Sequence, residues 1–279
     1  MPFKTLAAVL QSPADAGRVL DFTVPFASKY GSHVVGIHAE AIPLPYPSPT
    51  GVSSDLVFLE ATAEANRKRS AEIEKLFRSR ADAEGISAEW LSVETFMGDS
   101  AQPALANARA SDLVIAQQVD PESVAGDTGG IETLLFESGR PVLLIPYAGA
   151  VPAHIGRVLV AWNGSKESAR ATFDALPFLH AADEVELLLI DKDAESEEGW
   201  AGGAKIAETL ARHGLKVEVR DETAAGTPIG AIIGNRVAET GADLLVMGAY
   251  SRSRLSEWLF GGATRTVLES MPALTLMSR

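Results

Sequence analysis

Short apolar runs alternate with amphipathic segments along the second half of the chain. Such runs predict buried strands, and apolar residues at helical spacing predict helices that pack on a sheet. The strands are expected at residues 158–161, 184–190, 216–220, 244–247 and 273–277, and the helices at residues 165–179, 204–212, 228–239 and 262–270. Continuous apolar strands separated by helices are typical of a parallel sheet covered on both faces.

The first half repeats this order. Its strands are expected near residues 4–10, 33–38, 89–96, 113–116 and 142–146. Its second helix, residues 59–84, is longer and rich in charged residues, which predicts one solvated face. The predicted fold class is α/β, with two tandem doubly wound parallel-sheet domains, each of the order βαβαβαβαβ.

Two offsets align the halves of the sequence. An offset of 152 places Pro25 on Pro177, and an offset of 131 places Pro141 on Pro272. The difference of 21 residues is extra sequence in the first copy. The stretch 41–51 is the obvious place for it, because its prolines favour loop-like structure.

The small, uncharged stretch 147–156 has the composition of a short linker. A length of 279 residues also suits two domains better than one. The predicted domains are residues 1–149 and residues 150–279.

Composition narrows the classes of function. The absence of cysteine excludes disulfides and thiolate metal sites, and it fits a reducing cytoplasm, which is the expected location. The net charge of −13 argues against binding to nucleic acid or to an anionic membrane surface. It divides into −8 for residues 1–150 (11 basic, 19 acidic) and −5 for residues 151–279 (13 basic, 18 acidic). No apolar run is long enough for a membrane helix.

Glycines mark the loop after the fourth strand of the second half. Ligands bind at the carboxyl ends of parallel strands, where this loop and the loop after the first strand are expected to meet. Gly248 is expected to let the chain turn as it leaves the sheet. Gly261 and Gly262 lie just before a helix whose N-terminus favours anions.

The same loop is basic within an acidic chain. Arg252, Arg254 and Arg265 supply positive charge, and Thr264 supplies a hydroxyl group. This combination predicts a phosphate-binding loop. The alternative interpretation is a glycine-containing connection with solvated arginines.

This loop resembles the nucleotide motif of the universal stress protein family. The motif is a glycine, two residues, a second glycine, nine residues, and a glycine followed by serine or threonine. Gly248 and Gly261 stand at the first and third glycine positions with the family's spacing. Ser251 replaces the second glycine and Gly262 the final hydroxyl residue, whereas Thr264 matches a threonine that commonly follows.

Other stretches extend the resemblance over both halves. Asn163-Gly164-Ser165 is similar to the family's Asp-Gly-Ser after the first strand, with Asn in place of Asp. Gly226 is similar to the glycine before the third helix, and Pro272 to the proline before the last strand. The chain is therefore identified as a tandem member of this family.

The resemblance implies a stress-response protein with a Rossmann-like fold of the adenine nucleotide alpha hydrolase type. The implied ligand is an adenine nucleotide (ATP, ADP or AMP, with Mg²⁺) in the second domain. The implied binding residues are Asn163, Gly164, Ile190, Gly248, Ser251, Arg252, Gly261, Gly262 and Thr264. The last strands, 142–146 and 273–277, are expected to pair into an intramolecular pseudo-dimer, and a homodimer remains possible. The protein is expected to be no enzyme, or at most a weak ATPase, and its protein partners are unknown.

The first half departs further from the motif. The offset of 131 places Gln117, Asp120, Gly130 and Ile131 at the motif positions. This loop is acidic, and like charge disfavours phosphate. The first half is predicted to be structural or regulatory, with the excursion 41–58 and the long helix covering its pocket or docking a partner.

The sequence contains no recognised catalytic or metal-binding constellation. The five histidines lack metal-ligand spacing, and neither a nucleophile elbow nor a lysine-containing phosphate loop occurs. Three hypotheses stay open: nucleotide binding in the second domain, an interaction module that binds no nucleotide, and a slow ATPase without an identified base.

Overall fold

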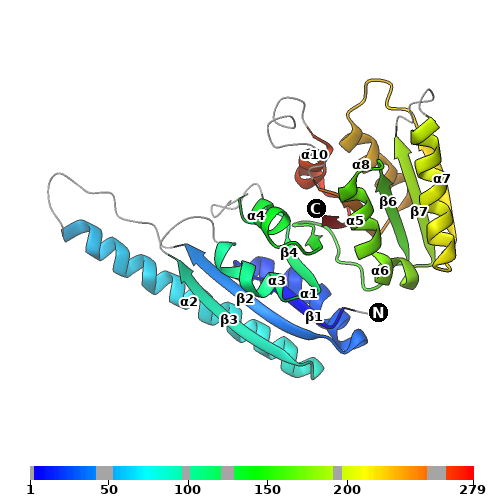
Figure 1. The fold of residues 1–279 in the computed structure, drawn as a ribbon. Helices are drawn as coiled ribbons and strands as arrows, with labels where there is room; N and C mark the ends of the chain where they lie inside the picture. Colours follow the sequence, from blue (N-terminus) through cyan, green and yellow to red (C-terminus); the bar gives the residue numbers. More distant parts are fainter. Residues whose placement is uncertain (1–2, 42–52, 96–100, 121–128, 191–196, 250–261) are drawn as a thin grey trace. The chain divides into compact units, whose positions relative to one another are not determined.

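The computed structural model describes residues 3–41, 53–95, 101–120, 129–190, 197–249 and 262–279 (Figure 1). The chain divides into two compact units, Pro2–Arg140 and Pro141–Arg279. Most of the predicted proline-rich excursion lies outside the described residues.

The first unit is a four-stranded parallel sheet with helices. Its strands are β1 (Thr5–Val9), β2 (His33–Ala41), β3 (Ala88–Thr95) and β4 (Leu113–Gln117). Its helices are α1 (Pro13–Tyr30), α2 (Ser53–Glu84), α3 (Leu105–Arg109) and α4 (Gly129–Glu137), with a 3₁₀ turn at Gln102–Ala104. The strands pair in the order β3-β2-β1-β4. Four of the five strands predicted for the first half lie in this unit, and the fifth, near residues 142–146, lies in the second unit. Helix α2 begins six residues before its predicted start at residue 59.

Helix α1 is defined at both ends by local hydrogen bonds. The Ser12 hydroxyl accepts a hydrogen bond from the backbone N–H of Asp15, and the Asp15 carboxylate accepts one from the N–H of Ser12. This reciprocal capping box satisfies donors that a helix N-terminus otherwise leaves open. At the other end Gly31 adopts φ 60°, a left-handed conformation that ends the helix.

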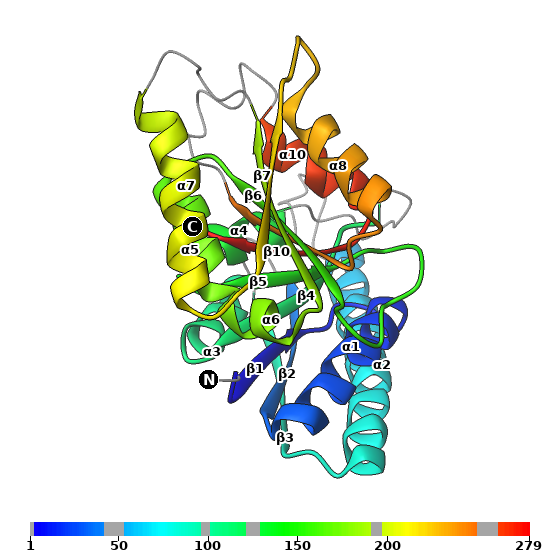
Figure 2. The ribbon, with the colours of Figure 1, turned by 90° about the vertical axis from the view of Figure 1, so that its right-hand side faces the viewer.

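Helices α1 and α2 pack side by side on one face of the first sheet (Figure 2). The ring of Phe77 in α2 lies against Gly36 of β2, where a Cβ atom would be 2.9 Å from the ring. The small residue therefore sets how closely α2 can approach the sheet. One side of this charged helix is solvated, as predicted, and the other covers β2 and β3.

The second unit contains six strands. They are β5 (Val142–Ile145), β6 (Arg157–Trp162), β7 (Glu184–Ile190), β8 (Val217–Glu222), β9 (Leu244–Gly248) and β10 (Leu274–Ser278). The helices are α5 (Lys166–Asp174), α6 (Leu176–Ala181), α7 (Glu197–Arg212), α8 (Ile229–Thr240) and α10 (Ala263–Ser270). Figure 2 shows α5 and α7 on one face of this sheet and α8 and α10 on the other, as in a doubly wound fold.

The strands of the second unit follow the order β5-β10-β9-β6-β7-β8. All neighbours are parallel except β5 and β10, which pair antiparallel with Leu143 opposite Leu276. The family resemblance implies this pairing of the last strands. The structure places residues 141–149, expected at the end of the first domain, within the second compact unit.

The predicted helix 165–179 is divided into α5 and α6. Pro177 has no N–H, so it cannot donate to the carbonyl four residues earlier, and the chain bends there. The N–H groups of Phe178 and Leu179 both donate to the carbonyl of Ala175. The aligned Pro25 leaves α1 continuous, so the repeat alone does not reveal the break.

The core follows the apolar runs. Every residue of β5 and β10 is buried, whereas most of the edge strand β8 is exposed, as its alternating sequence predicts. Burial of each large apolar side chain contributes about 1.5–3 kcal/mol. Within the described ranges, no helix has both the length and the apolar character needed to cross a bilayer.

Candidate functional site

Three neighbouring strands of the second unit end at the same edge. Ala161 of β6 pairs with Met247 of β9, and Trp162 pairs with Leu189 of β7. The next residues along these strands are therefore also neighbours. They are the predicted site residues Asn163, Ile190 and Gly248. The structure brings these three together at the carboxyl edge, where parallel sheets bind ligands.

The loop after β6 is a tight turn that leads into α5. The side-chain Oδ1 of Asn163 accepts a hydrogen bond from the backbone N–H of Ser165 at 3.1 Å. Gly164 adopts φ 75°, which favours glycine. Ser165 then caps α5, since its hydroxyl oxygen accepts from the N–H of Ser168 at 3.1 Å. Ser165 is thus the N-cap of α5, and the exposed Asn163 side chain uses its Oδ1, not its Nδ2 group, in this turn.

Position 248 requires a glycine because two backbones approach each other closely there, which the sequence analysis did not predict. It is the last residue of β9 and is not among the described glycines with a positive φ. A Cβ atom at this position would lie 2.5 Å from the backbone nitrogen of Ser168 and 2.6 Å from the carbonyl carbon of Glu167. Its small size therefore lets the N-terminus of α5 approach the end of β9, while its predicted role in the turn that follows concerns residues that are mostly outside the described ranges.

Helix α10 presents its N-terminus to the same edge. It connects β9 to the parallel strand β10, so it runs back against the strand direction and begins near their carboxyl ends. Its N-cap, Gly262, has no side chain, and no side-chain hydrogen bond caps the helix. The backbone N–H groups of the first helical turn have no partner within the helix, and the helix N-terminus carries a positive partial charge. Both properties favour the binding of an anion there.

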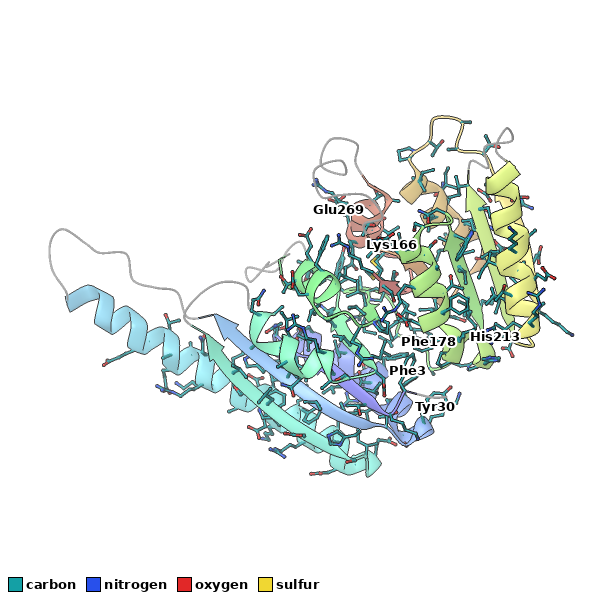
Figure 3. All side chains as sticks on the ribbon, viewed as in Figure 1. Phe3, Tyr30, Lys166, Phe178, His213 and Glu269 are labelled. Carbon is teal, nitrogen blue, oxygen red and sulfur yellow. The ribbon has the colours of Figure 1, made fainter. Side chains whose placement is uncertain are left out.

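The remaining predicted residues near α10 have different surroundings. Thr264 is buried in the first helical turn, with an exposed fraction of 3%. Arg265 points to solvent, and its Nε donates to Oε1 of Glu269 at 2.8 Å (Figure 3 labels Glu269). Part of its positive charge is therefore already paired. The predicted residues Ser251, Arg252, Arg254 and Gly261 lie outside the described residues.

Glu167 is a residue of this edge that sequence analysis missed. It is the second residue of α5, and its side chain is only 3% exposed. Among the described residues, its ion-pair partner is Nζ of Lys166 at 3.7 Å, on a side chain that is 91% exposed (labelled in Figure 3). The available signal was its spacing, because Glu167 lies four residues before the buried Ala171 and shares its helix face.

The corresponding edge of the first unit is arranged differently. The Asp15 carboxylate accepts hydrogen bonds from the backbone N–H groups of Gln11 at 3.0 Å and Ser12 at 2.6 Å. Burial raises the pKa of Asp15 above its usual value, and these hydrogen bonds partly offset that rise. Gln117, aligned with Gly248, has a buried Oε1 atom without a hydrogen-bond partner. An internal carboxylate thus occupies amides that a phosphate would need.

A cavity of about 340 Å³ lies at the opposite edge of the second sheet. It is lined by the amino-terminal ends of β6, β7 and β8, including Arg157, Glu184 and Glu218. Arg157 is already paired, through Nε to Oε2 of Glu184 at 3.0 Å and through Nη1 to the carbonyl of Thr240 at 3.1 Å. Four acidic residues line this cavity against two basic ones, so it does not suit a phosphate.

Comparison with known proteins identifies the second half. Residues 154–279 match the model of the Universal stress protein family. This half of the chain is therefore similar to that family. The comparison with curated proteins found no significant match.

Solved structures extend the fold over both units. A universal stress protein from Archaeoglobus fulgidus DSM 4304 is 19% identical, covers 98% of this chain and 96% of its own, and has a TM-score of 0.69. A functionally unknown protein from Pseudomonas aeruginosa PAO1 is 16% identical, covers 99% and 92%, and has a TM-score of 0.60. The predicted fold class, two tandem α/β domains with mostly parallel sheets, is therefore confirmed. Among the described residues, no three or more His, Asp and Glu side chains gather as metal ligands.

Proposed function

We propose that the second unit binds an adenine nucleotide at the carboxyl edge of β9, β6 and β7, as part of a stress response. The observation that carries the proposal is the position of Gly248. It brings the capped N-terminus of α5 against the end of β9, at the start of the loop with the universal stress protein spacing. Two helix N-termini, those of α5 and α10, then face the same edge and favour phosphate.

The residues at this edge suit different parts of a nucleotide. The exposed Nδ2 group of Asn163 can donate to a ribose or base edge, while its Oδ1 holds the turn. Ile190 provides a partly exposed apolar side chain for a base. The amides at the start of α10, from Gly262 onwards, suit the phosphates. Gly164 allows the left-handed backbone conformation of the turn. The proposed set of binding residues also includes Ser251, Arg252, Gly261 and Thr264.

We propose that the first unit, within residues 1–149, serves structure or regulation and does not bind nucleotide. The carboxylate of Asp15 already accepts the backbone N–H groups of the loop after β1. The antiparallel pair of β5 and β10 supports an intramolecular pseudo-dimer of the two repeats. The second candidate function, an interaction module without nucleotide, is favoured by the same loop, which is closed to anions.

Calorimetric titration with ATP, ADP and AMP, with and without Mg²⁺, tests nucleotide binding. We expect Asn163→Ala to weaken binding about tenfold, the loss of roughly one hydrogen bond. Gln11→Ala, in the loop after β1, is the matched control and should leave affinity unchanged. Native mass spectrometry of freshly purified protein should also show a bound nucleotide. Absence of heat at millimolar nucleotide, together with absence of a co-purifying nucleotide, would rule out the proposal and favour the interaction module.

The same titrations, followed by measurement of released phosphate, address turnover. We propose binding without a dedicated catalytic cycle, so ADP formation from ATP should stay at the rate of the uncatalysed reaction. A burst of ADP that disappears in an Arg252→Ala, Arg265→Ala double variant would instead support a weak ATPase.

A further inference from the structure

Strand β8 forms an open edge of the second sheet. It pairs in parallel with β7, from Val217 opposite Val185 to Glu222 opposite Ile190, and no described strand pairs with its other side. Most of β8 is exposed, and Figure 2 shows it in amber at the edge that faces the viewer, between α7 and α8. The backbone N–H and C=O groups of such an edge can pair with one more strand.

The charges of this strand are complementary about Val219. When two copies of a strand pair antiparallel, each residue faces the residue that lies equally far on the other side of the centre. With Val219 at the centre, Glu218 faces Arg220 of the partner subunit, and Lys216 faces Glu222 of the partner subunit. The valine, which is 42% exposed, faces itself. This register forms opposite-charge pairs on both sides of the centre and no like-charge pair.

A shift of the centre by one residue removes this match. Centred on Glu218, the pairing sets Lys216 against Arg220 and Glu218 against itself. Centred on Arg220, it sets Glu218 against Glu222 and Arg220 against itself. Like charges directly opposite each other are destabilising, so the charges select the register centred on Val219. The edge strand β3 of the first unit offers no such match, because it contains glutamate and no basic residue.

The surroundings of Glu218 suit a positive side chain. Neither Lys216 nor Glu218 has an ion-pair partner among the described residues. Arg220 lies 3.8 Å from Glu222 of its own strand, on a side chain that is 52% exposed. Glu218 also lines the cavity of about 340 Å³, where acidic residues outnumber basic ones. The register centred on Val219 places Arg220 of the partner subunit directly opposite Glu218, at the side of this acidic cavity.

We propose that two copies of the chain associate through β8, antiparallel and centred on Val219. The second sheets of the two copies then continue into each other across a two-fold axis. The same surface is used on both copies, so the contact closes as a dimer. It leaves the pair of β5 and β10 undisturbed, and it concerns a different surface from the proposed nucleotide edge.

Sedimentation velocity of the full chain tests the interface. The wild-type protein should be a dimer whose dissociation constant rises at least about tenfold between low salt and about 1 M NaCl. Glu218→Arg and Arg220→Glu each replace opposite-charge pairs with like-charge pairs, and each should raise the dissociation constant at least about tenfold. The double variant Glu218→Arg, Arg220→Glu exchanges the two charges. It should dimerise within about threefold of wild type, because residues 218 and 220 again match.

Cross-linking gives a direct readout of the register. The chain contains no cysteine, so Val219→Cys introduces a single thiol. In the proposed register the Cα atoms of residue 219 in the two copies lie about 4.5–5.5 Å apart, which suits a disulfide. Mild oxidation should convert most of this variant to a covalent dimer. Ile229→Cys, at a similarly exposed position in α8, is the control and should stay monomeric on a denaturing gel.

A charge reversal on the other edge strand is the second control. Glu89→Arg changes an exposed glutamate of β3 and should leave the dimer unchanged, while circular dichroism checks that each variant is folded. A wild-type protein that sediments as a monomer at about 0.1 mM and low salt would overturn the proposal. A dimer that is insensitive to both single charge reversals would also overturn it. So would species larger than a dimer, since these would show that β8 pairs with a different edge.

Discussion

The two units begin alike, with a strand, a short turn and a serine-capped helix, yet different side chains hold the turn before that helix. In the first unit Asp15 folds back onto the turn and fills its amides. In the second unit Ser168 stands at the corresponding helical position, and the buried carboxylate is Glu167, one residue earlier. The first turn is therefore held by the carboxylate of Asp15, and the second by the side-chain oxygen of Asn163, which accepts from the N–H of Ser165.

The two units also differ in the residue at the end of the fourth strand of each repeat. Gly248 lets α5 approach β9 so closely that no side chain fits, while the aligned residue of the first unit is Gln117, whose Oε1 atom is buried. Duplication thus kept the fold and changed the residues at one edge. Binding and framework roles can diverge in this way because strand and helix patterning does not depend on the loops.

Among the substitutions that test this difference between the units, Gly248→Ala should cause the largest loss of stability. The new Cβ would lie 2.5 Å from the backbone of α5, which cannot move without disturbing the sheet. We expect a loss of about 3 kcal/mol in the free energy of unfolding, measured by urea denaturation. Gly234→Ala in α8 is the matched control, since no atom lies within 4 Å of its Cβ position. It should stabilise the protein by about 0.5–1 kcal/mol. Equal effects of the two changes would mean that α5 does not approach β9 closely.

Removal of the two N-caps should give an intermediate effect. Ser165→Ala leaves the amide of Ser168 without its hydroxyl acceptor, and about 1 kcal/mol of stability should be lost. Ser12→Ala should cost less, because the Asp15 carboxylate continues to hold the turn through the N–H groups of Gln11 and Ser12. Chemical denaturation of both variants measures the difference, and a larger loss for Ser12→Ala would contradict the self-closed first turn.

The pH dependence of Asp15 should be the smallest effect. Burial raises its folded-state pKa above the ordinary value of 3.8, so the folded protein binds the proton more tightly than the unfolded chain. The contribution is fully present below pH 3.8 and is lost as the pH rises through the folded pKa. Urea denaturation of wild type and Asp15→Asn over this range should show wild type losing stability relative to the variant as the pH rises. A constant difference would show that the pKa is not raised.

Periodicity was enough to predict most of the fold. Strand β7 lies at its predicted limits, 184–190, because its apolar run is long and bounded by charge. The break between α5 and α6 was missed, since Pro25 shows that the same proline position can also lie in a continuous helix. Local sequence does not distinguish the two cases, because packing decides whether a helix bends at a proline.

The candidate site was predicted less completely than the fold. Strand order predicted that the loops with Asn163 and Gly248 meet, whereas Ile190 was expected only from the family resemblance. The close backbone approach that requires glycine at position 248 was not predicted, because it involves residues 80 positions apart in the sequence. Glu167 was missed because glutamate in a first helical turn usually faces water, and its burial depends on what covers the helix.

The position of β5 determines where a stable fragment of the second unit should begin. A fragment starting at residue 150, at the apparent end of the repeat, would lack β5 and leave one side of β10 without its hydrogen-bonding neighbour. Such a bare, wholly apolar edge invites pairing with a second chain. A fragment starting at residue 141 would carry its own edge strand, so an expression boundary nine residues earlier should separate a well-behaved domain from one that aggregates.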